Sequence, residues 1–304
     1  MLTESLSRLG TESANASAAD LDRKSALEIA RLVNAEDAKV APAVRRALPQ
    51  IARAIDLITA ALRQGGRLIY VGTGTSGRIA ALDAAECPPT FGTDPRTVQF
   101  VIAGGVKALA AAVEASEDSR SLGRREIARK KPGSRDVVVG IAASGRTPFT
   151  LAALAYARRH GSKTIGVTCN RNSPLERTAD VTIITEVGPE VVAGSSRMKA
   201  GTAQKMVLNM LSTGAMARLG YVCGNLMVNV HPKNSKLRAR AIAILERATG
   251  ARSAAASRVL AAARNSTPVA LVMLAAGVNR AQAAAALEKT RGHVREAIAV
   301  AKRG

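Results

Sequence analysis

The sequence predicts an α/β fold: a doubly wound parallel sheet of five strands, with helices before it and a small helical module after it. Five short apolar runs, of the kind buried in parallel sheets, alternate with helical patterns. Glycine and hydroxyl residues directly follow two of these runs, as they do at strand-to-helix turns. After His231-Pro232 the composition changes to Ala, Arg and Lys, which indicates a separate helical module over 238–304.

The N-terminal region is predicted to be an irregular arm followed by helices. Residues 1–20 are rich in Ser, Thr, Asn and Ala, and the polar members of this set favour caps and turns over helix interiors. Apolar residues then recur at helical spacing over 19–34 and from Ala41 to Leu62. Both helices are expected to precede the first strand.

The apolar runs place the strands, of which the first follows Gly65-Gly66. The strands are expected at 67–71, 98–103, 137–142, 164–168 and 181–185. Helical patterns occupy 106–117, 148–159 and 200–219. Such alternation is typical of parallel strands joined by right-handed crossovers. In the C-terminal module, Gly250 and Gly277 are expected to separate about three short helices.

The strong positive charge does not by itself indicate a nucleic-acid partner. The formal net charge is +21, and such proteins often bind nucleic acid or anionic membranes. Here the basic residues are scattered singly and in pairs over helical faces, and three Tyr, three Phe and no Trp leave few rings on which bases could stack. We therefore expect neither a nucleic acid nor a membrane as partner.

The compartment is expected to be the cytoplasm. No run approaches the roughly 20 apolar residues that a membrane helix needs, and the opening residues lack the apolar centre of a signal peptide. Cys87, Cys169 and Cys223 are widely spaced without a CxxC pair, so neither a disulfide framework nor a zinc site is expected.

The first candidate binding loop is Gly72-Thr-Gly-Thr-Ser-Gly77, which matches G-x-G-x-x-G between a strand and a helix. A nicotinamide site would also need an acidic residue at the end of the second strand, and that strand ends in Ala103-Gly-Gly105 without one. What remains is a set of backbone N–H groups at the start of the helix that Ser76 opens, with the hydroxyls of Thr73, Thr75 and Ser76. Gly74 is assigned to the same binding loop. The loop therefore indicates a phosphate or sugar-hydroxyl site.

A second loop repeats the first. Ser144, Gly145, Arg146 and Thr147 follow the third strand, and Pro148 suits the first turn of a helix. Since two hydroxyl-rich helix starts lie at the ends of parallel strands, we expect them to form one cleft.

A third loop precedes the helix at 200–219. It carries Ser195 and Ser196, followed by the cations Arg197 and Lys199. Cations at a helix N-terminus are unfavourable, so a solvated basic first turn explains this pattern poorly. A bound anion would remove the objection, and we assign Ser195, Ser196 and Lys199 to the ligand.

Two carboxylates are candidates for acid and base work. Glu86 precedes Pro88-Pro89, where the helix is expected to end, and Glu117 is expected at the end of the helix over 106–117. A carboxylate at the negative end of a helix has a raised pKa, which suits proton transfer. On the residues alone, a solvated helix-end acid is the favoured interpretation of each. His160, His231 and His293 show neither a triad nor metal-ligand spacing.

These residues resemble the N-acetylmuramic acid 6-phosphate etherase family. The resemblance is carried by RLIYVGTGTSGR at 67–78, ECPPT at 86–90, VGIAASGRTP at 139–148 and GSSRMKAGTAQK at 194–205. Further matching strings are TESAN at 11–15, NMLST at 209–213 and GNLMV at 224–228. The likeness extends over nearly the whole chain, and only the C-terminal module is matched loosely.

The resemblance implies a fold and an assembly. It implies a flavodoxin-like sugar isomerase (SIS) domain over 58–221, an N-terminal arm and helices over 1–57, and a UBA-like module over 238–304. It further implies a homodimer that uses no cofactor and no metal.

The resemblance also implies a reaction. Water replaces the D-lactyl ether at C3 of the sugar, which gives N-acetylglucosamine 6-phosphate and D-lactate in cell-wall recycling. Glu86 falls on the family's proton donor and Glu117 on its second essential carboxylate, to which we assign the base. The C1 aldehyde of the open-chain sugar acidifies the C2 proton, so a base can remove it while an acid protonates the ether oxygen.

Three other functions stay open at this point. A phosphosugar sensor that controls a partner protein would share the fold but would not need both Glu86 and Glu117. An aldose-ketose isomerase would share the C2 proton abstraction but needs no acid for an ether oxygen. Nucleic-acid binding would be salt-dependent and independent of the loop serines. The net charge is unusually basic for the etherase family, although it leaves the motifs intact.

Overall fold

The computed structural model describes residues 9–111, 113, 116–230, 232 and 234–303. These form two compact units. Unit 1 comprises Met1–Ala84 and Arg96–Ser212, and unit 2 comprises Ala85–Pro95 and Thr213–Gly304. The division falls inside α5 (Gly74–Phe91) and α9 (Lys199–Arg218), so each of these helices supplies residues to both units. The domain ranges expected from the sequence stay a prediction.

Unit 1 begins with an irregular arm and helices, as expected, although residues 1–8 of that arm lie outside the described residues. The elements are η1 (Ala16–Ala18), η2 (Leu21–Arg23), α2 (Ala26–Asp37), α3 (Val40–Arg46) and α4 (Leu48–Arg63). A capping box starts α2, because the Ser25 side chain accepts from the Glu28 N–H and Glu28 bonds back to Ser25. The helix expected from Ala41 divides at Ala47, and Pro49 in the first turn of α4 suits the new start.

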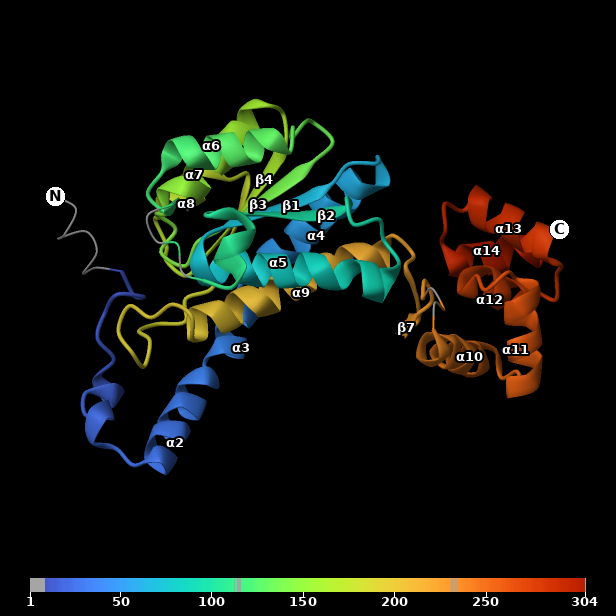
Figure 1. The fold of residues 1–304 in the computed structure, drawn as a ribbon, viewed down its shortest axis with the longest axis horizontal. Helices are drawn as coiled ribbons and strands as arrows, with labels where there is room; N and C mark the ends of the chain where they lie inside the picture. Colours follow the sequence, from blue (N-terminus) through green and yellow to red (C-terminus); the bar gives the residue numbers. More distant parts are fainter. Residues whose placement is uncertain (1–8, 112, 114–115, 231, 233, 304) are drawn as a thin grey trace. The chain divides into compact units, whose positions relative to one another are not determined.

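The five-stranded parallel sheet is confirmed. Its strands are β1 (Leu68–Gly72), β2 (Val98–Ile102), β3 (Val137–Ile141), β4 (Lys163–Thr168) and β5 (Val181–Ile184). Their order is β2-β1-β3-β4-β5 (Figure 1). The chain leaves β1 to one side for β2 and returns to the other side for β3, so the strand order reverses between β1 and β3. In such sheets, ligands bind at the carboxyl ends of the strands beside this reversal.

Helices cover both faces of this sheet, with α6 (Arg120–Arg129), α7 (Pro148–Arg159) and α8 (Pro174–Thr178) on one side and α4, α5 and α9 on the other (Figure 1). The core includes fully buried Ile69, Val138, Phe149 and Leu154. Burial of such side chains stabilises the fold by about 1.5–3 kcal/mol each.

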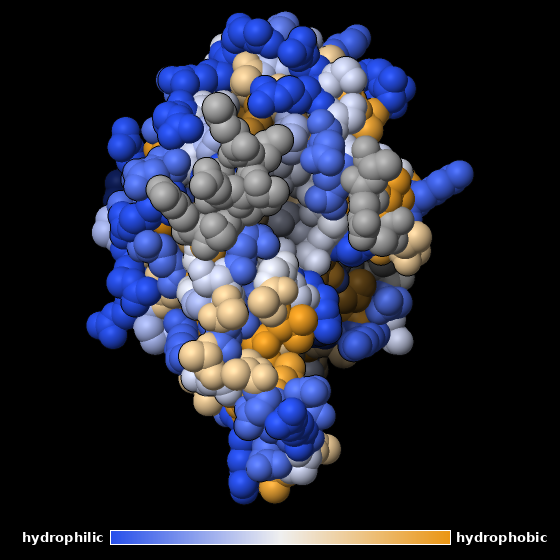
Figure 2. Space-filling view, turned by 90° about the vertical axis from the view of Figure 1, so that its left-hand side faces the viewer, coloured by the Kyte–Doolittle hydropathy of each residue, from blue (hydrophilic) through white to orange (hydrophobic). Residues whose placement is uncertain are grey.

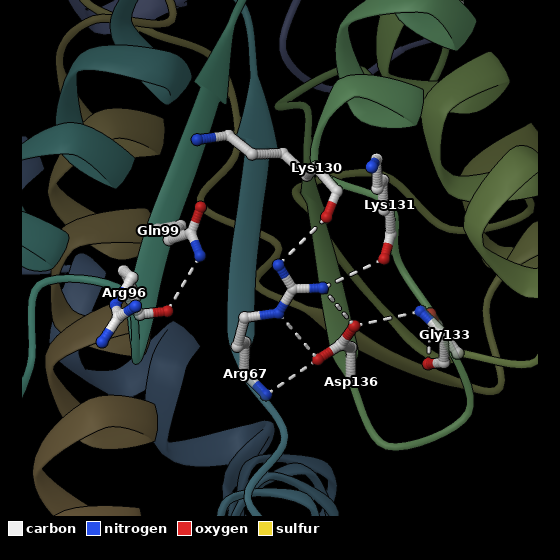
Figure 3. Close-up of polar contacts among 8 residues, drawn as sticks. Arg67, Arg96, Gln99, Lys130, Lys131, Gly133 and Asp136 are labelled. Atoms are coloured by element: carbon white, nitrogen blue, oxygen red, sulfur yellow. Dashed lines mark hydrogen bonds and ion pairs between the residues drawn. The ribbon is translucent and has the colours of Figure 1, made fainter.

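The amino ends of β1 and β3 are joined by an ion pair (Figure 3). Asp136 accepts from the backbone N–H of Arg67 at 2.9 Å and from its guanidinium at 2.7 Å. The guanidinium also donates to the carbonyls of Lys130 and Lys131. This network fixes the end of the sheet opposite to the glycine and hydroxyl loops.

Two helices differ from the sequence predictions. In the range expected to be a helix, 106–117, the structure has the 3-10 helix η3 (Gly105–Leu109), which Gly104 and Gly105 start with φ of 84° and 66°. Residues 112, 114 and 115 of that range lie outside the described residues. The helix expected to stop at Glu86 continues through Pro88 and Pro89 to Phe91. Each proline removes one intrahelical donor, but the helical bonding resumes at once with Gly92 N–H to Pro88 O.

Unit 2 holds the rest of α5 and α9, a hairpin and five helices. The hairpin is β6 (Val222–Cys223) with β7 (Leu226–Met227). The helices are α10 (Ser235–Thr249), α11 (Ser253–Ala262), α12 (Thr267–Ala276), α13 (Arg280–Lys289) and α14 (Val294–Ala301). Gly250 and Gly277 end α10 and α12 in the left-handed conformation, as their positions in the sequence indicate. The predicted count of about three helices was too low, because short Ala-rich helices without glycine breaks are hard to separate.

No single helix of the described part of the chain has both the length and the apolar composition for a membrane span; α11 and α12 reach them only as a pair bent by 119°. Hydrophilic residues cover most of the face drawn in Figure 2, around a smaller hydrophobic area.

Some of the arginines lie on exposed helix surface beside carboxylates. The side chains of Arg125 and Arg129 are 65% and 67% exposed, and both form ion pairs with Glu126.

Candidate active site

The loop between β1 and α5 is a tight turn that leads straight into a helix. α5 begins at Gly74, and Gly77 donates its N–H to Thr73 O at 3.0 Å. A Cβ on Gly77 would lie 2.5 Å from Ile102 Cγ1, so only glycine fits against the neighbouring strand. The first N–H groups of a helix have no partner within that helix and favour an anion.

The hydroxyl residues of this loop differ in their surroundings. Thr73 and Ser76 are buried, at 8% and 9% exposure, and Thr75 is half-buried. Ser76 Oγ donates to Gln204 Oε1 at 2.9 Å. Thr75 packs against Gly201 of α9, since a Cβ on that glycine would lie 3.3 Å from Thr75 Cγ2. The start of α9 therefore lies against the first turn of α5.

The loop between β3 and α7 is equally constrained. Gly145 has φ of 68°, and a Cβ there would lie 2.4 Å from Ser173 Oγ and 2.7 Å from Thr168 Oγ1. The half-buried Ser144 accepts from the N–H of Arg146 at 3.2 Å. Thr147 precedes Pro148 at the start of α7, as predicted. The β1–α5 and β3–α7 loops thus follow the two strands that flank the reversal of strand order.

Glu117 lies between these two loops. It is half-buried, and its Oε1 is 3.1 Å from the position that a Cβ on Gly74 would occupy. Its carbonyl accepts from the N–H of Phe149 in the first turn of α7 at 3.0 Å. It lies in the turn before Ser119, which caps α6. The helix that was expected to end at Glu117 includes residues 112, 114 and 115, which lie outside the described residues, so that expectation stays a prediction. The Glu117 carboxylate faces the start of α5, where the N–H groups favour negative charge.

Glu86 is an exposed residue in the interior of α5. The expectation that it ends a helix was wrong, since α5 continues for more than a turn beyond it. The sequence argument that rested on a helix end at Glu86 therefore does not apply. It belongs to the stretch Ala85–Pro95 of unit 2.

In the third loop the two serines are partly exposed, whereas the lysine is buried. Ser195 and Ser196 are half-buried, and Ser196 O accepts from Gly201, which contacts Thr75. Lys199 is only 1% exposed and forms an ion pair with Glu36 of α2. The expectation that Lys199 binds the ligand is therefore corrected, because its ammonium is buried in the ion pair with Glu36.

The anion that the basic start of α9 requires comes from the protein itself. Glu190 is fully buried and accepts from the backbone N–H groups of Lys199 at 3.0 Å and Ala200 at 2.9 Å. Glu36 balances the Lys199 charge and also accepts from Lys39 at 2.6 Å. Burial alone would raise the pKa of Glu36, but hydrogen bonds from both lysines outweigh it and lower that pKa from 4.5 to about 2.

The lowered pKa of Glu36 predicts a pH dependence of stability. A carboxylate with a depressed folded-state pKa adds stability above its unfolded pKa of 4.5, and this stability is lost as the pH falls toward about 2. Urea midpoints should therefore drop between pH 4.5 and pH 2, and the drop should be shallower in Glu36→Gln. Equal slopes for the two proteins would contradict this assignment.

A second buried carboxylate, Asp83, connects three elements of unit 1. It accepts from Tyr70 of β1 at 2.8 Å and from Asn209 and Ser212 of α9 at 2.8 and 3.0 Å. Burial raises its pKa, although these hydrogen bonds oppose the rise. Asp83, Glu36, Glu190 and Gln204 were missed by the sequence analysis. An acid inside an apolar helical pattern was the one signal for Asp83, while the others have partners far away in the sequence.

No group of three or more His, Cys, Asp or Glu residues in the described ranges is arranged to hold a metal ion.

Within unit 1 the structure brings together the three loops and Glu117. This doubly wound sheet with hydroxyl loops at helix starts agrees with the class of protein that two family models identify, the SIS domains. The SIS domain family matches residues 132–214, and the glucokinase regulatory protein N-terminal SIS domain family matches residues 50–158.

Full-length relatives identify the family. A protein of Symbiobacterium thermophilum named N-acetylmuramic acid 6-phosphate etherase is 56% identical over 90% of this chain and 91% of its own length. One of Aeromonas hydrophila with the same name is 48% identical over 96% of this chain and 98% of its own length. The chain belongs to the N-acetylmuramic acid 6-phosphate etherase family. A solved phosphoheptose isomerase of Francisella tularensis shares the fold, with a TM-score of 0.52 over 64% of this chain and 100% of that one, at 18% identity.

Proposed function

We propose that this protein cleaves the D-lactyl ether of N-acetylmuramic acid 6-phosphate with water, giving N-acetylglucosamine 6-phosphate and D-lactate. Membership of the etherase family is the first support. The observation in the structure that carries the proposal is the position of Glu117, whose carboxylate lies 3.1 Å from the Cβ position of Gly74, at the start of α5. In this proposal Glu117 is the base, and its position supports a base at the edge of the loop that binds the anion.

The reaction follows from the chemistry of the open-chain sugar. Glu117 removes the C2 proton, which the C1 aldehyde acidifies, and the electron pair forms a C2–C3 double bond as the C3–O bond breaks. Glu86 gives a proton to the departing ether oxygen, which becomes the hydroxyl of lactate. Water then adds at C3 of the unsaturated aldehyde and a proton returns to C2. The net change consumes one water, and the protein's own acid and base suffice without a cofactor.

The loops bind the substrate in this proposal. The N–H groups at Gly74 and the hydroxyls of Thr75 and Ser76 hold the 6-phosphate and adjacent sugar oxygens. The second loop adds Ser144, Gly145, Arg146 and Thr147, and the third adds Ser195 and Ser196. None of these side chains acts as a nucleophile.

We also propose a homodimer, which the family resemblance implies, and a cytoplasmic location, which the sequence composition favours. Sedimentation of the purified chain tests the assembly. A mass of one chain at micromolar concentration would contradict it.

The experiment for the acid assigned to Glu86 separates its two proton transfers. Glu86→Ala should release no D-lactate from N-acetylmuramic acid 6-phosphate, yet should still exchange the C2 proton with solvent. The C2 proton is removed by a different residue, so deuterium incorporation from D2O by NMR measures that step alone. Loss of both lactate release and exchange, in a variant with wild-type thermal stability, would contradict the acid role.

A non-catalytic phosphosugar sensor is the second candidate. The match of residues 50–158 to a domain family of a regulatory protein favours it. A sensor would bind sugar phosphates and release no lactate under any condition, so the lactate assay on the wild-type protein decides between the two.

A further inference from the structure

Ser76 and Gln204 form a buried polar pair between α5 and α9. The hydroxyl of Ser76 donates to Gln204 Oε1 at 2.9 Å, and the two side chains are 9% and 1% exposed. The contact of Thr75 with Gly201 lies beside this pair. The pair therefore lies directly behind the first turn of α5, which holds the ligand in the proposed function.

The second polar atom of the Gln204 side chain is not used by the fold. Its Nε2 is buried and has no acceptor among the residues that the structure describes. A buried donor without a partner costs free energy of folding, and an apolar side chain of the same length would avoid that cost. Packing therefore does not explain a glutamine at this position. The hydrogen bond that its Oε1 accepts from Ser76 in the ligand loop does explain it.

The hydrogen bond to Gln204 determines whether the Ser76 hydroxyl donates to a ligand or accepts from it. A serine hydroxyl has one proton to donate and lone pairs that accept. Since the proton is directed to Gln204, the oxygen is left as an acceptor on its other side. A phosphate ester at neutral pH carries nearly two negative charges and has little to donate, while a sugar hydroxyl can donate.

We propose that Gln204 is a positioning residue that turns the Ser76 proton away from the ligand, so that Ser76 accepts a hydrogen bond from a sugar hydroxyl. The phosphate is then held by the N–H groups at the start of α5 and by the other loop hydroxyls. This inference rests on the proposed function for the identity of the ligand. It states that Ser76 contacts the sugar hydroxyls and not the phosphate.

The test compares two ligands in Gln204→Met, measured by calorimetry and thermal shift. Affinity for N-acetylglucosamine 6-phosphate should fall by up to about tenfold, the worth of one neutral hydrogen bond. Affinity for inorganic phosphate should stay the same or rise, because the freed hydroxyl can now donate to it. The midpoint of thermal unfolding without ligand should not fall. An equal loss for both ligands would overturn the assignment.

A double-mutant cycle shows whether Gln204 acts through Ser76. In a Ser76→Ala background, Gln204→Met should cause no further loss of affinity for the sugar phosphate, whereas additive losses would overturn the inference. If Gln204→Met does not fold, Gln204→Asn replaces it in the same cycle, since its shorter carboxamide cannot reach Ser76.

A matched control and a separate activity assay complete the test. Gln99 at the amino end of β2 donates to Arg96 O (Figure 3), so Gln99→Met removes a carboxamide far from the loops and should leave both affinities unchanged. Binding of N-acetylglucosamine 6-phosphate and of inorganic phosphate is measured without release of lactate. If the wild-type protein releases no lactate, that result therefore contradicts the etherase proposal alone. Additive losses in the cycle contradict the Gln204 inference alone.

Discussion

Glu117→Gln is expected to lower the rate of D-lactate release by about 10²- to 10⁴-fold, the usual contribution of a positioned general base. The amide has the same shape as the acid but cannot take the C2 proton. Exchange of that proton with D2O should be lost to the same extent. Since the Glu117 carbonyl still accepts from Phe149, thermal stability should stay close to that of the wild type.

The exposed neighbour Asp118 provides the matched control. Asp118→Asn removes one negative charge from the same turn and should leave both rates unchanged. If Glu117→Gln kept the wild-type exchange rate, Glu117 would not be the base, whatever happened to lactate release.

Lys199→Met is expected to destabilise the protein by about 3–5 kcal/mol, the cost of leaving one partner of a buried ion pair uncompensated. Glu36 is 3% exposed, and among the described residues Lys39 would be its remaining cationic partner. Urea unfolding followed by circular dichroism measures the loss. The double variant Glu36→Gln/Lys199→Met should recover part of it, because no buried charge is then left alone.

Lys39→Met is the control for this cluster, because the Lys39 side chain is 60% exposed and its loss should cost about 1 kcal/mol or less. If Lys199→Met had wild-type stability but bound sugar phosphate weakly, the sequence prediction of Lys199 as a ligand residue would be right and the structural interpretation wrong.

The features that were predicted correctly depend on neighbours in the sequence. The strands follow from short apolar runs, and the turn at Gly72 to Gly77 follows from glycines that a close backbone approach requires. The C-terminal helix ends at Gly250 and Gly277 follow from the same left-handed preference. Local steric rules were therefore sufficient for the sheet and for the β1–α5 loop.

The features that were missed depend on residues far apart in the sequence. Lys199 and Glu36 meet only when α2 packs against the start of α9, and no local pattern marks either residue as buried. Ser76 and Gln204 likewise meet only through packing of two helices. The end of α5 was misplaced because the rule that a residue before proline avoids helix is a tendency, and α5 continues through Pro88 and Pro89 to Phe91.

The most direct test of the account is the mass of the products formed by the wild-type protein from N-acetylmuramic acid 6-phosphate in D2O. Elimination followed by hydration predicts free D-lactate together with N-acetylglucosamine 6-phosphate that carries one deuterium at C2. Absence of lactate, or lactate released beside a sugar without deuterium at C2, would contradict the mechanism in which Glu117 removes that proton.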